Sequence, residues 1–246
     1  MPSTATRTPS RASLRERVDI IEWDAIHEQL DGRGFAVTPP LLGATECEEL
    51  AGLFDGGRFR STVDMARHRF GDGRYREVAH PLPDAIAELR GALYPRLAPI
   101  ANAWSALLGG PGDAFPLEHE DLLARCREAG QERPTPLILR YGPGDWNALH
   151  QDLYGDVFFP FQAVTVLSEA GVDHDGGEFV LLEQRPRAQS RAHVVTPPRG
   201  ALVIFPTRER PNQGSRGYHR IGLRHGVSTV TSGQRTALGI IFHDAR

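Results

Sequence analysis

The stretch His225-Gly-Val-Ser-Thr-Val-Thr-Ser-Gly-Gln-Arg235 leads directly into the apolar run T-A-L-G-I-I-F, residues 236–242. This run predicts a buried strand, because it is short and carries β-branched and aromatic residues. Similar short runs, separated by Gly and Pro turns, recur from Leu137 onward and favour a β-sandwich or barrel. The predicted strands are 137–141, 157–167, 178–182, 193–196, 201–205, 227–230 and 236–242.

The chain before residue 134 has a helical pattern instead. Apolar residues from Leu14 to Leu30 recur at the spacing of one amphipathic helix, and residues 83–108 predict a long helix that is interrupted near Pro95 and Pro99. Residues 1–13 predict a disordered tail. The expected fold class is α+β: one domain over 14–246, with mainly helical support over 14–133 and a jelly-roll core over 134–246.

Composition limits the class of protein. The chain has 246 residues, a net charge of −3 and only two cysteines, which excludes a disulfide framework and favours a reducing cytoplasm. It has neither a membrane-length apolar run nor the apolar stretch of a secretory signal, so we expect no membrane partner. Between Arg185 and Arg224, nine arginines accompany a single acid, Glu209. They either form an anion-attracting face or are simply solvated.

Three residues predict a metal site. His150 and Asp152 lie two apart, and residues two apart on a strand point to the same side. His225, placed at the start of the strand predicted over 227–230, supplies a second imidazole. Two imidazoles and one carboxylate suit Fe(II), with positions left for 2-oxoglutarate and O2. His219 competes as the third ligand, but it lies in a Gly- and Arg-rich stretch that predicts a loop, so His225 is favoured.

A cosubstrate carboxylate needs a buried positive partner. Arg235 follows His225 by ten residues and opens the last predicted strand. Its planar guanidinium pairs with a carboxylate bidentately and keeps its charge when desolvated. Tyr141, nine residues before His150, is expected either to add a phenolic hydrogen bond or to belong to the core.

These segments resemble the Fe(II)/2-oxoglutarate-dependent dioxygenases, over roughly residues 137–245. The distal segment 225–238 is similar to the prolyl-4-hydroxylase type, as is Gly176-Gly177-Glu178, while the proximal segment R-Y-G-P-G-D-W-N-A-L-H-Q-D, residues 140–152, is similar to AlkB-type nucleic-acid demethylases. The chain departs from the AlkB type in lacking its widely spaced arginine pair and in having Leu139 where that type has a polar ligand.

The resemblance implies a double-stranded β-helix and a set of site residues. It implies that 2-oxoglutarate contacts Tyr141. It also implies metal ligands at His150, Asp152 and His225 and a cosubstrate anchor at Arg235. The implied reaction is hydroxylation or oxidative demethylation of a substrate C–H, with Fe(II), 2-oxoglutarate and O2.

The substrate is predicted from a basic segment around Gly71-Asp72-Gly73, which has the pattern of a hairpin turn. An aromatic ring beside cations suits a nucleic acid, so we favour alkylated nucleic acid, followed by a protein side chain and then a small molecule. A solvated hairpin and a non-catalytic binding module on the same fold are the alternatives. The candidate substrate residues, which form a possible lid, are Arg67, Arg69, Arg74, Tyr75 and Arg76.

Overall fold

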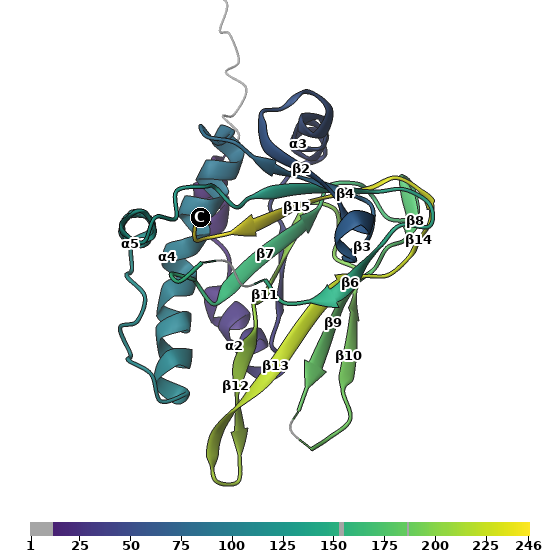
Figure 1. The fold of residues 1–246 in the computed structure, drawn as a ribbon. Coiled ribbons are helices and arrows are strands. Elements are labelled where there is room, and N and C mark those ends of the chain that lie inside the picture. The colour runs from purple at the N-terminus through teal and green to yellow at the C-terminus, as the bar shows by residue number, and fades with distance from the viewer. Residues whose placement is uncertain (1–11, 153–154, 186) are drawn as a thin grey trace, which may run out of the picture.

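Two antiparallel sheets face each other, and the helices lie outside them (Figure 1). The structure is a computed structural model that describes residues 12–152, 155–185 and 187–246. The arrangement is a double-stranded β-helix, so the predicted α+β fold with a jelly-roll core is confirmed.

The larger sheet separates the helices from the interior between the sheets. On its strand β7 (Phe161–Val166), Phe161 packs into the helix-side core, whereas the next residue, Gln162, lines the interior. This is the alternation expected of a strand with two buried faces. Within the described residues the sheet order is β1 (Ala36–Pro40), β11 (Ala201–Pro206), β7, β15 (Arg235–Ile241), β5 (Leu137–Tyr141), β4 (Arg74–Val78) and β2 (Phe59–Asp64).

The smaller sheet forms the opposite wall. Its order over the described ranges is β10 (Arg191–Val195), β9 (Phe179–Gln184), β13 (Gly217–Val227), β6 (Trp146–His150) and β3 (Gly71–Asp72). β12 (Glu209–Gly214) pairs with β13, and β8 (His174–Gly176) pairs with β14 (Val230–Gly233). The strand predicted over 227–230 is therefore wrong, because a long strand ends at Val227 and a different one begins at Val230.

The N-terminal half contributes strands as well as helices. β1, β2 and β4 extend the larger sheet and β3 extends the smaller one. The predicted boundary at residue 134 thus separates helices from strands only in part. The helices and the single helical turn of the described residues are α1 (Leu14–Asp19), α2 (Trp23–Arg33), α3 (Ala44–Gly56), η1 (Met65–His68), α4 (Asp84–Leu107) and α5 (His119–Glu128).

Two helix predictions differ from the structure. The single helix expected over 14–30 is broken between α1 and α2, where Ile20 is 79% exposed and so leaves the apolar stripe. The interruption expected at Pro95 and Pro99 is absent, since both lie inside the continuous helix α4. Proline removes a backbone hydrogen bond, but buried side chains along α4 keep the helix packed.

Only residues 12 and 13 of the tail that was predicted to be disordered lie within the described residues. Residues 1–11 lie outside the described residues, so their predicted disorder stays a prediction. Ser13 is ordered by a capping box, in which its hydroxyl accepts the Glu16 N–H at 3.2 Å and the Glu16 carboxylate accepts the Ser13 N–H at 2.7 Å.

The main hydrophobic core lies between the helices and the outer face of the larger sheet. Leu93 and Leu97 of α4 meet Ile138, Leu238 and other apolar residues of the sheet there. The sheet's inner face is therefore left to line the space between the two sheets. Among the described helices, none combines the length and apolar character needed to span a membrane.

Candidate metal centre

His150 and His225 lie opposite each other on neighbouring strands. They are direct partners in the antiparallel pairing of β6 with β13. Gly226 permits the close approach, because a Cβ there would lie 2.6 Å from the Asn147 carbonyl oxygen. His225 is near the end of β13, so its predicted place at the start of a strand is wrong, although the strands do bring the two histidines together.

Asp152 reaches the histidines from outside the strand. β6 ends at His150, so the predicted two-residue alternation does not apply. The amide nitrogen of the intervening Gln151 donates instead to the carbonyls of Arg208 and Leu223, each at 2.9 Å. These bonds hold the chain where it leaves β6, and Asp152 faces back toward the two rings.

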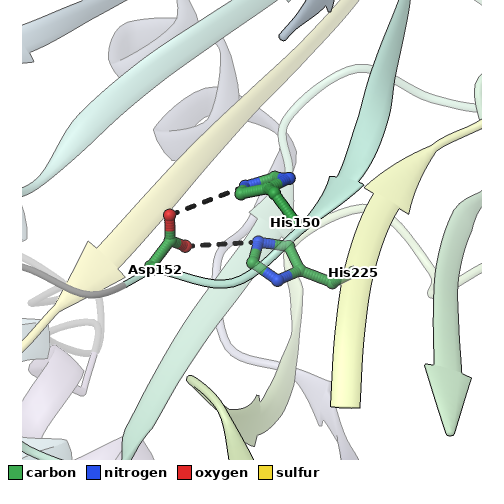
Figure 2. Close-up of side chains that lie close together, drawn as sticks. All are labelled: His150, Asp152 and His225. Atoms are coloured by element: carbon green, nitrogen blue, oxygen red, sulfur yellow. Dashed lines mark ion pairs between the residues drawn. The ribbon is translucent and has the colours of Figure 1, made fainter. Parts of the chain in front are cut away.

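The three side chains converge on one point (Figure 2). The Asp152 carboxylate lies 3.5 Å from His150 Nε2 and 3.3 Å from His225 Nε2, each through a different oxygen. One nitrogen or oxygen atom from each residue lies within 4.8 Å of the others, which is the spacing of ligands around a single cation. The donor set of two imidazoles and a carboxylate fits Fe(II).

The surroundings of the imidazoles suit metal binding. His150 Nδ1 lies 2.7 Å from the Ala148 carbonyl oxygen, so Nδ1 carries the proton and Nε2 is left as the donor atom. Burial lowers the pKa of His150, and the neighbouring His225 lowers it further. The His225 ring packs against Phe205, with ring centroids 4.8 Å apart, and against Phe179 at 5.9 Å.

His219 takes no part in the group. It lies on β13 opposite Asn212, in the exposed hairpin made by β12 and β13. The loop predicted for it is therefore wrong, because the Gly, Ser and Arg residues around it concealed a strand that is exposed over its first four residues. The preference for His225 over His219 agrees with the geometry.

Arg235 is buried without a polar partner. Its side chain is 1% exposed, and within the described residues its guanidinium has no hydrogen bond or ion pair, with Nε left unsatisfied. Burial lowers its pKa, an effect opposed by Tyr141 and Glu178. The Tyr141 ring lies 5.6 Å from the guanidinium carbon. Gly177 makes room, because a Cβ there would lie 2.6 Å from Arg235 Cδ.

A buried arginine without a partner is exceptional, because the desolvated charge is strongly unfavourable. Arg235 lines the cavity that also contains the metal group, so the site fits a ligand with a carboxylate. Tyr141 is fully buried beside it, and burial raises the pKa of its phenol to about 12, so the hydroxyl remains a hydrogen-bond donor.

The cavity lies between the two sheets and has a volume of about 400 Å³. The metal group, Tyr141 and Arg235 all lie on its wall. The other lining residues are mostly apolar: Met65, Arg69, Phe70, Tyr75, Leu137, Leu139, Asn147, Ala148, Leu149, Gln151, Gln162, Ala163, Val164, Phe179, Phe205, Val227, Ala237, Gly239 and Ile241.

Two of the five candidate substrate residues reach this cavity. Arg69 and Tyr75 line it, and burial raises the pKa of Tyr75. Arg67 and Arg74 are exposed and are not part of the lining. Arg76 points to the other face of the sheet, where it stacks on Phe54 at 4.8 Å and donates to the Phe54 carbonyl oxygen. The inclusion of Arg76 is not supported by its position.

The predicted hairpin has a different geometry. β2 pairs with β4, and residues 65–73 connect them. Gly71-Asp72, expected as the turn, is strand β3 and pairs with β6 of the other sheet. Gly71 permits this, because its φ is +116° and a Cβ would lie 2.3 Å from the Trp146 carbonyl oxygen. The segment 65–73 therefore links the two sheets beside the cavity, and its action as a lid stays a prediction.

Five of the nine arginines from Arg185 to Arg224 contact a carboxylate. Arg185 and Arg210 contact Glu183 at 2.7 and 3.4 Å, and Arg199 lies 3.5 Å from Glu48. Arg208 and Arg220 contact Glu209. These carboxylates reduce the positive charge of the stretch. The residues at the cavity mouth are therefore the better candidates for contact with an anionic partner.

Residues that the sequence analysis missed also line the cavity. Gln162 lay within the strand predicted over 157–167, where the polar residue in an apolar run was the available signal. Phe179 and Phe205 had no signal of their own, because any buried strand contains such residues. Asn147 lay inside the proximal motif but was not singled out; its amide nitrogen lies 3.4 Å from the Tyr141 hydroxyl.

Solved structures share this fold at low sequence identity. A Pseudomonas putida prolyl-4-hydroxylase matches at a TM-score of 0.52 and 19% identity, covering 91% of this chain and 99% of that one. A Burkholderia pseudomallei oxidoreductase of the 2OG-Fe(II) oxygenase family gives 0.54 and 17%, covering 91% and 92%. A Trichoplax adhaerens prolyl hydroxylase, in complex with a hypoxia inducible factor peptide fragment, gives 0.56 and 17%, covering 92% and 90%.

The fold and the His-Asp-His group define an Fe(II)/2-oxoglutarate-dependent oxygenase, which confirms the expected superfamily, enzyme class and cofactors. Residues 73–245 match the family model Oxygenase-NA, described as "Oxygenase, catalysing oxidative methylation of damaged DNA", and the chain belongs to this family. Uncharacterized proteins from two strains of Mycobacterium tuberculosis are 53% identical over 165 residues, which cover 67% of this chain and 70% of each relative.

Proposed function

We propose that this oxygenase removes alkyl groups from damaged nucleic acid, using iron held by His150, Asp152 and His225 and 2-oxoglutarate anchored by Arg235. One observation carries the proposal: the three metal-ligand side chains line the same cavity as a buried arginine that has no polar partner among residues 12–152, 155–185 and 187–246. The family description supplies the substrate class, because it names damaged DNA.

The chain's residues have separate tasks in this site. His150 and His225 offer their Nε2 atoms, and Asp152 adds the negative charge that favours a divalent cation. Arg235 pairs with the far carboxylate of the cosubstrate, and the Tyr141 hydroxyl donates beside it. The apolar walls exclude water from the reacting groups.

The bound iron and 2-oxoglutarate supply the oxidising chemistry, in which O2 and 2-oxoglutarate become succinate and CO2 with one oxygen atom left for the substrate. For an N-methyl group, that oxygen enters a C–H bond and gives an N-hydroxymethyl group. The C–N bond then breaks, the nitrogen recovers a proton from the hydroxyl, and formaldehyde leaves. The products balance without another co-reactant.

Aromatic and basic side chains at the cavity mouth support a nucleic-acid substrate. The His68 and Phe70 rings stack with centroids 5.5 Å apart and planes at 21°, and Phe70 is 45% exposed. Arg69, between them in sequence, lines the cavity. Exposed rings stack on bases regardless of sequence, and an arginine beside them meets phosphate.

The test is the release of succinate from 2-oxoglutarate by the purified protein with Fe(II) and ascorbate. We expect slow succinate formation without substrate and a clear stimulation by single-stranded oligonucleotides that carry N-methylated bases, with one formaldehyde formed for each additional succinate. Unmethylated oligonucleotides and proline-containing peptides are the comparison substrates.

Asp152→Ala is the inactive control, because it removes the charged ligand. Stimulation by the peptides alone would replace nucleic acid with a protein side chain as the substrate. The absence of succinate under every condition would contradict the oxygenase site itself.

A further inference from the structure

We propose that Gln162 recognises the substrate by hydrogen-bonding the edge of a nucleobase inside the cavity; this deepens the proposed function and rests on it. Gln162 is 4% exposed and lines the cavity. Its amide nitrogen has no hydrogen-bond partner among the described residues. Buried amides in folded proteins nearly always have partners, so the empty position indicates a ligand.

Strand pairing places Gln162 close to the metal group. Gln162 on β7 is the direct cross-strand partner of Phe205 on β11, so their side chains lie side by side on the interior face. The Phe205 ring in turn packs on His225, with centroids 4.8 Å apart. A group bound by the Gln162 amide is thus separated from the metal-ligating ring by one aromatic side chain.

The cosubstrate anchor lies too far away to explain Gln162. On its other side, Gln162 pairs with Ile241, the last residue of β15, whereas Arg235 is the first. A strand of this length spans about 20 Å, and the far carboxylate of 2-oxoglutarate lies at the Arg235 end. A five-carbon diacid held at Arg235 therefore leaves the Gln162 end of the cavity for the substrate.

The chemistry of the amide selects the kind of group it binds. A primary amide offers one acceptor and two donors side by side, and it forms paired hydrogen bonds with a partner that presents an acceptor next to a donor. Nucleobases present such edges, and glutamine pairs with adenine in this way. Because the reacting atom of a base is covered in a duplex, the base enters this cavity unstacked from its neighbours.

The variant that tests the proposal is Gln162→Leu, which replaces the amide by an apolar side chain of comparable volume. Binding of a fluorescent single-stranded oligonucleotide, with or without one N-methylated adenine, is measured by anisotropy on protein loaded with Mn(II) and 2-oxoglutarate. We expect the variant to bind the methylated oligonucleotide about 10-fold or more weakly. Its salt dependence should match that of wild type, because a neutral residue is removed.

Thr165→Val is the matched control. Thr165 lies on the same strand and is also buried, and its hydroxyl has no partner in the described part of the chain, but it does not line the cavity. We expect Thr165→Val to leave oligonucleotide binding unchanged. The melting temperature of Gln162→Leu should be equal to or above that of wild type, because a buried unsatisfied amide is lost. Thr165→Val should also leave 2-oxoglutarate affinity and substrate-free succinate formation unchanged.

Several results would overturn the assignment. If Gln162→Leu binds the methylated oligonucleotide as tightly as wild type does, Gln162 does not contact the base. If the variant loses only 2-oxoglutarate affinity, Gln162 is a cosubstrate ligand instead. Wild-type protein that forms succinate but neither prefers methylated oligonucleotides nor is stimulated by them refutes the nucleic-acid substrate, and this inference fails with it.

Discussion

Replacing Arg235 by methionine should change stability and cosubstrate binding in opposite directions. The guanidinium is 1% exposed and has no polar partner among the described residues, so the protein without ligand holds an uncompensated charge. Methionine keeps most of the apolar stem and removes that charge. We expect the unliganded variant to be more stable than wild type and to have lost its response to 2-oxoglutarate.

The size of the stability gain follows from the surroundings. An unpaired buried ion is unfavourable by several kcal/mol, and the Tyr141 ring 5.6 Å away offsets about 1–2 kcal/mol of this. A net gain of about 1–3 kcal/mol corresponds to a rise of about 2–12 °C in melting temperature for a domain of this size. Wild type should instead gain about 3 kcal/mol from 2-oxoglutarate at a hundred times its Kd.

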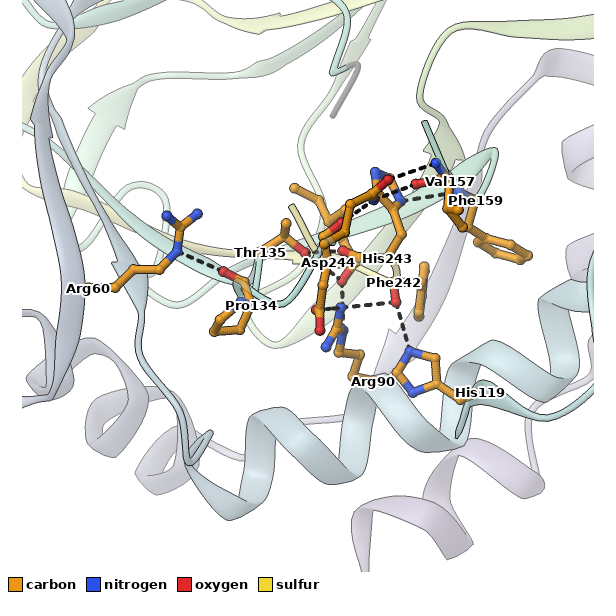
Figure 3. Close-up of polar contacts among 12 residues, drawn as sticks. Arg60, Arg90, His119, Pro134, Thr135, Val157, Phe159, Phe242, His243 and Asp244 are labelled. Atoms are coloured by element: carbon orange, nitrogen blue, oxygen red, sulfur yellow. Dashed lines mark hydrogen bonds and ion pairs between the residues drawn. The ribbon is translucent and has the colours of Figure 1, made fainter. Parts of the chain in front are cut away.

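Thermal melts with Mn(II), with and without 2-oxoglutarate, separate these effects. Arg90→Met is the matched control, because Arg90 is equally buried but satisfied: it donates to the carbonyls of Ile241 and Phe242 and pairs with Asp244 at 2.6 Å (Figure 3). Its loss should destabilise the protein by about 3–5 kcal/mol. A destabilised Arg235→Met that still responds to 2-oxoglutarate would refute the assignment of Arg235 as the anchor.

Three further predictions test the metal, the pH dependence and the partner. His225→Ala should lower the Mn(II) affinity measured by calorimetry more than about 100-fold, whereas His219→Ala should not change it. Equal losses of affinity in the two variants would contradict the choice of His225 as the ligand. Burial lowers the pKa of His119 and of His243 from 6.5 to about 4. Between these pH values the unfolded chain binds more protons than the folded one. The free energy of unfolding should therefore fall as the pH drops from 6.5 to 4, by up to about 3 kcal/mol per histidine. Urea denaturation across this range should show the slope, and His119→Gln should flatten it; an unchanged slope contradicts the assignment. Arg69→Ser should weaken oligonucleotide binding and reduce the slope of log K against log salt by about one, whereas an unaltered slope would place the phosphate elsewhere.

The sequence predicted that His150, Asp152 and His225 come together, for a reason that was only partly correct. His150 and Asp152 were placed on one strand, but the strand ends at His150, and a hydrogen bond from Gln151 to the Arg208 carbonyl holds the chain just before Asp152. That hydrogen bond joins residues far apart in the chain, so no local pattern contains it. The convergence was nevertheless predictable, because a jelly roll brings sequence-distant strands side by side.

Strand positions were predictable where apolar residues fill both faces, as in β5 and β15. They were not predictable at β13, whose first residues form an exposed hairpin with β12 and have no apolar alternation. The run over 157–167 was predicted too long at its start. The strand begins only after Pro160, which has no N–H to donate to a neighbouring strand.

Arg235 and Gln162 share a property that separates them from the other buried polar groups of the cavity. Each is almost fully buried, and each has a nitrogen without a partner in the part of the chain that the structure describes. They lie toward opposite ends of the strand pairing between β7 and β15. One is charged and suits a carboxylate, whereas the other is neutral and suits a paired donor and acceptor. His225 contacts the Phe205 ring, which lies beside Gln162, and it shares the cavity with Arg235. The metal group therefore has a position for a neutral ligand on one side and a position for a carboxylate on the other. An oxygenase that must bind an anionic cosubstrate and a separate substrate at one metal requires this division.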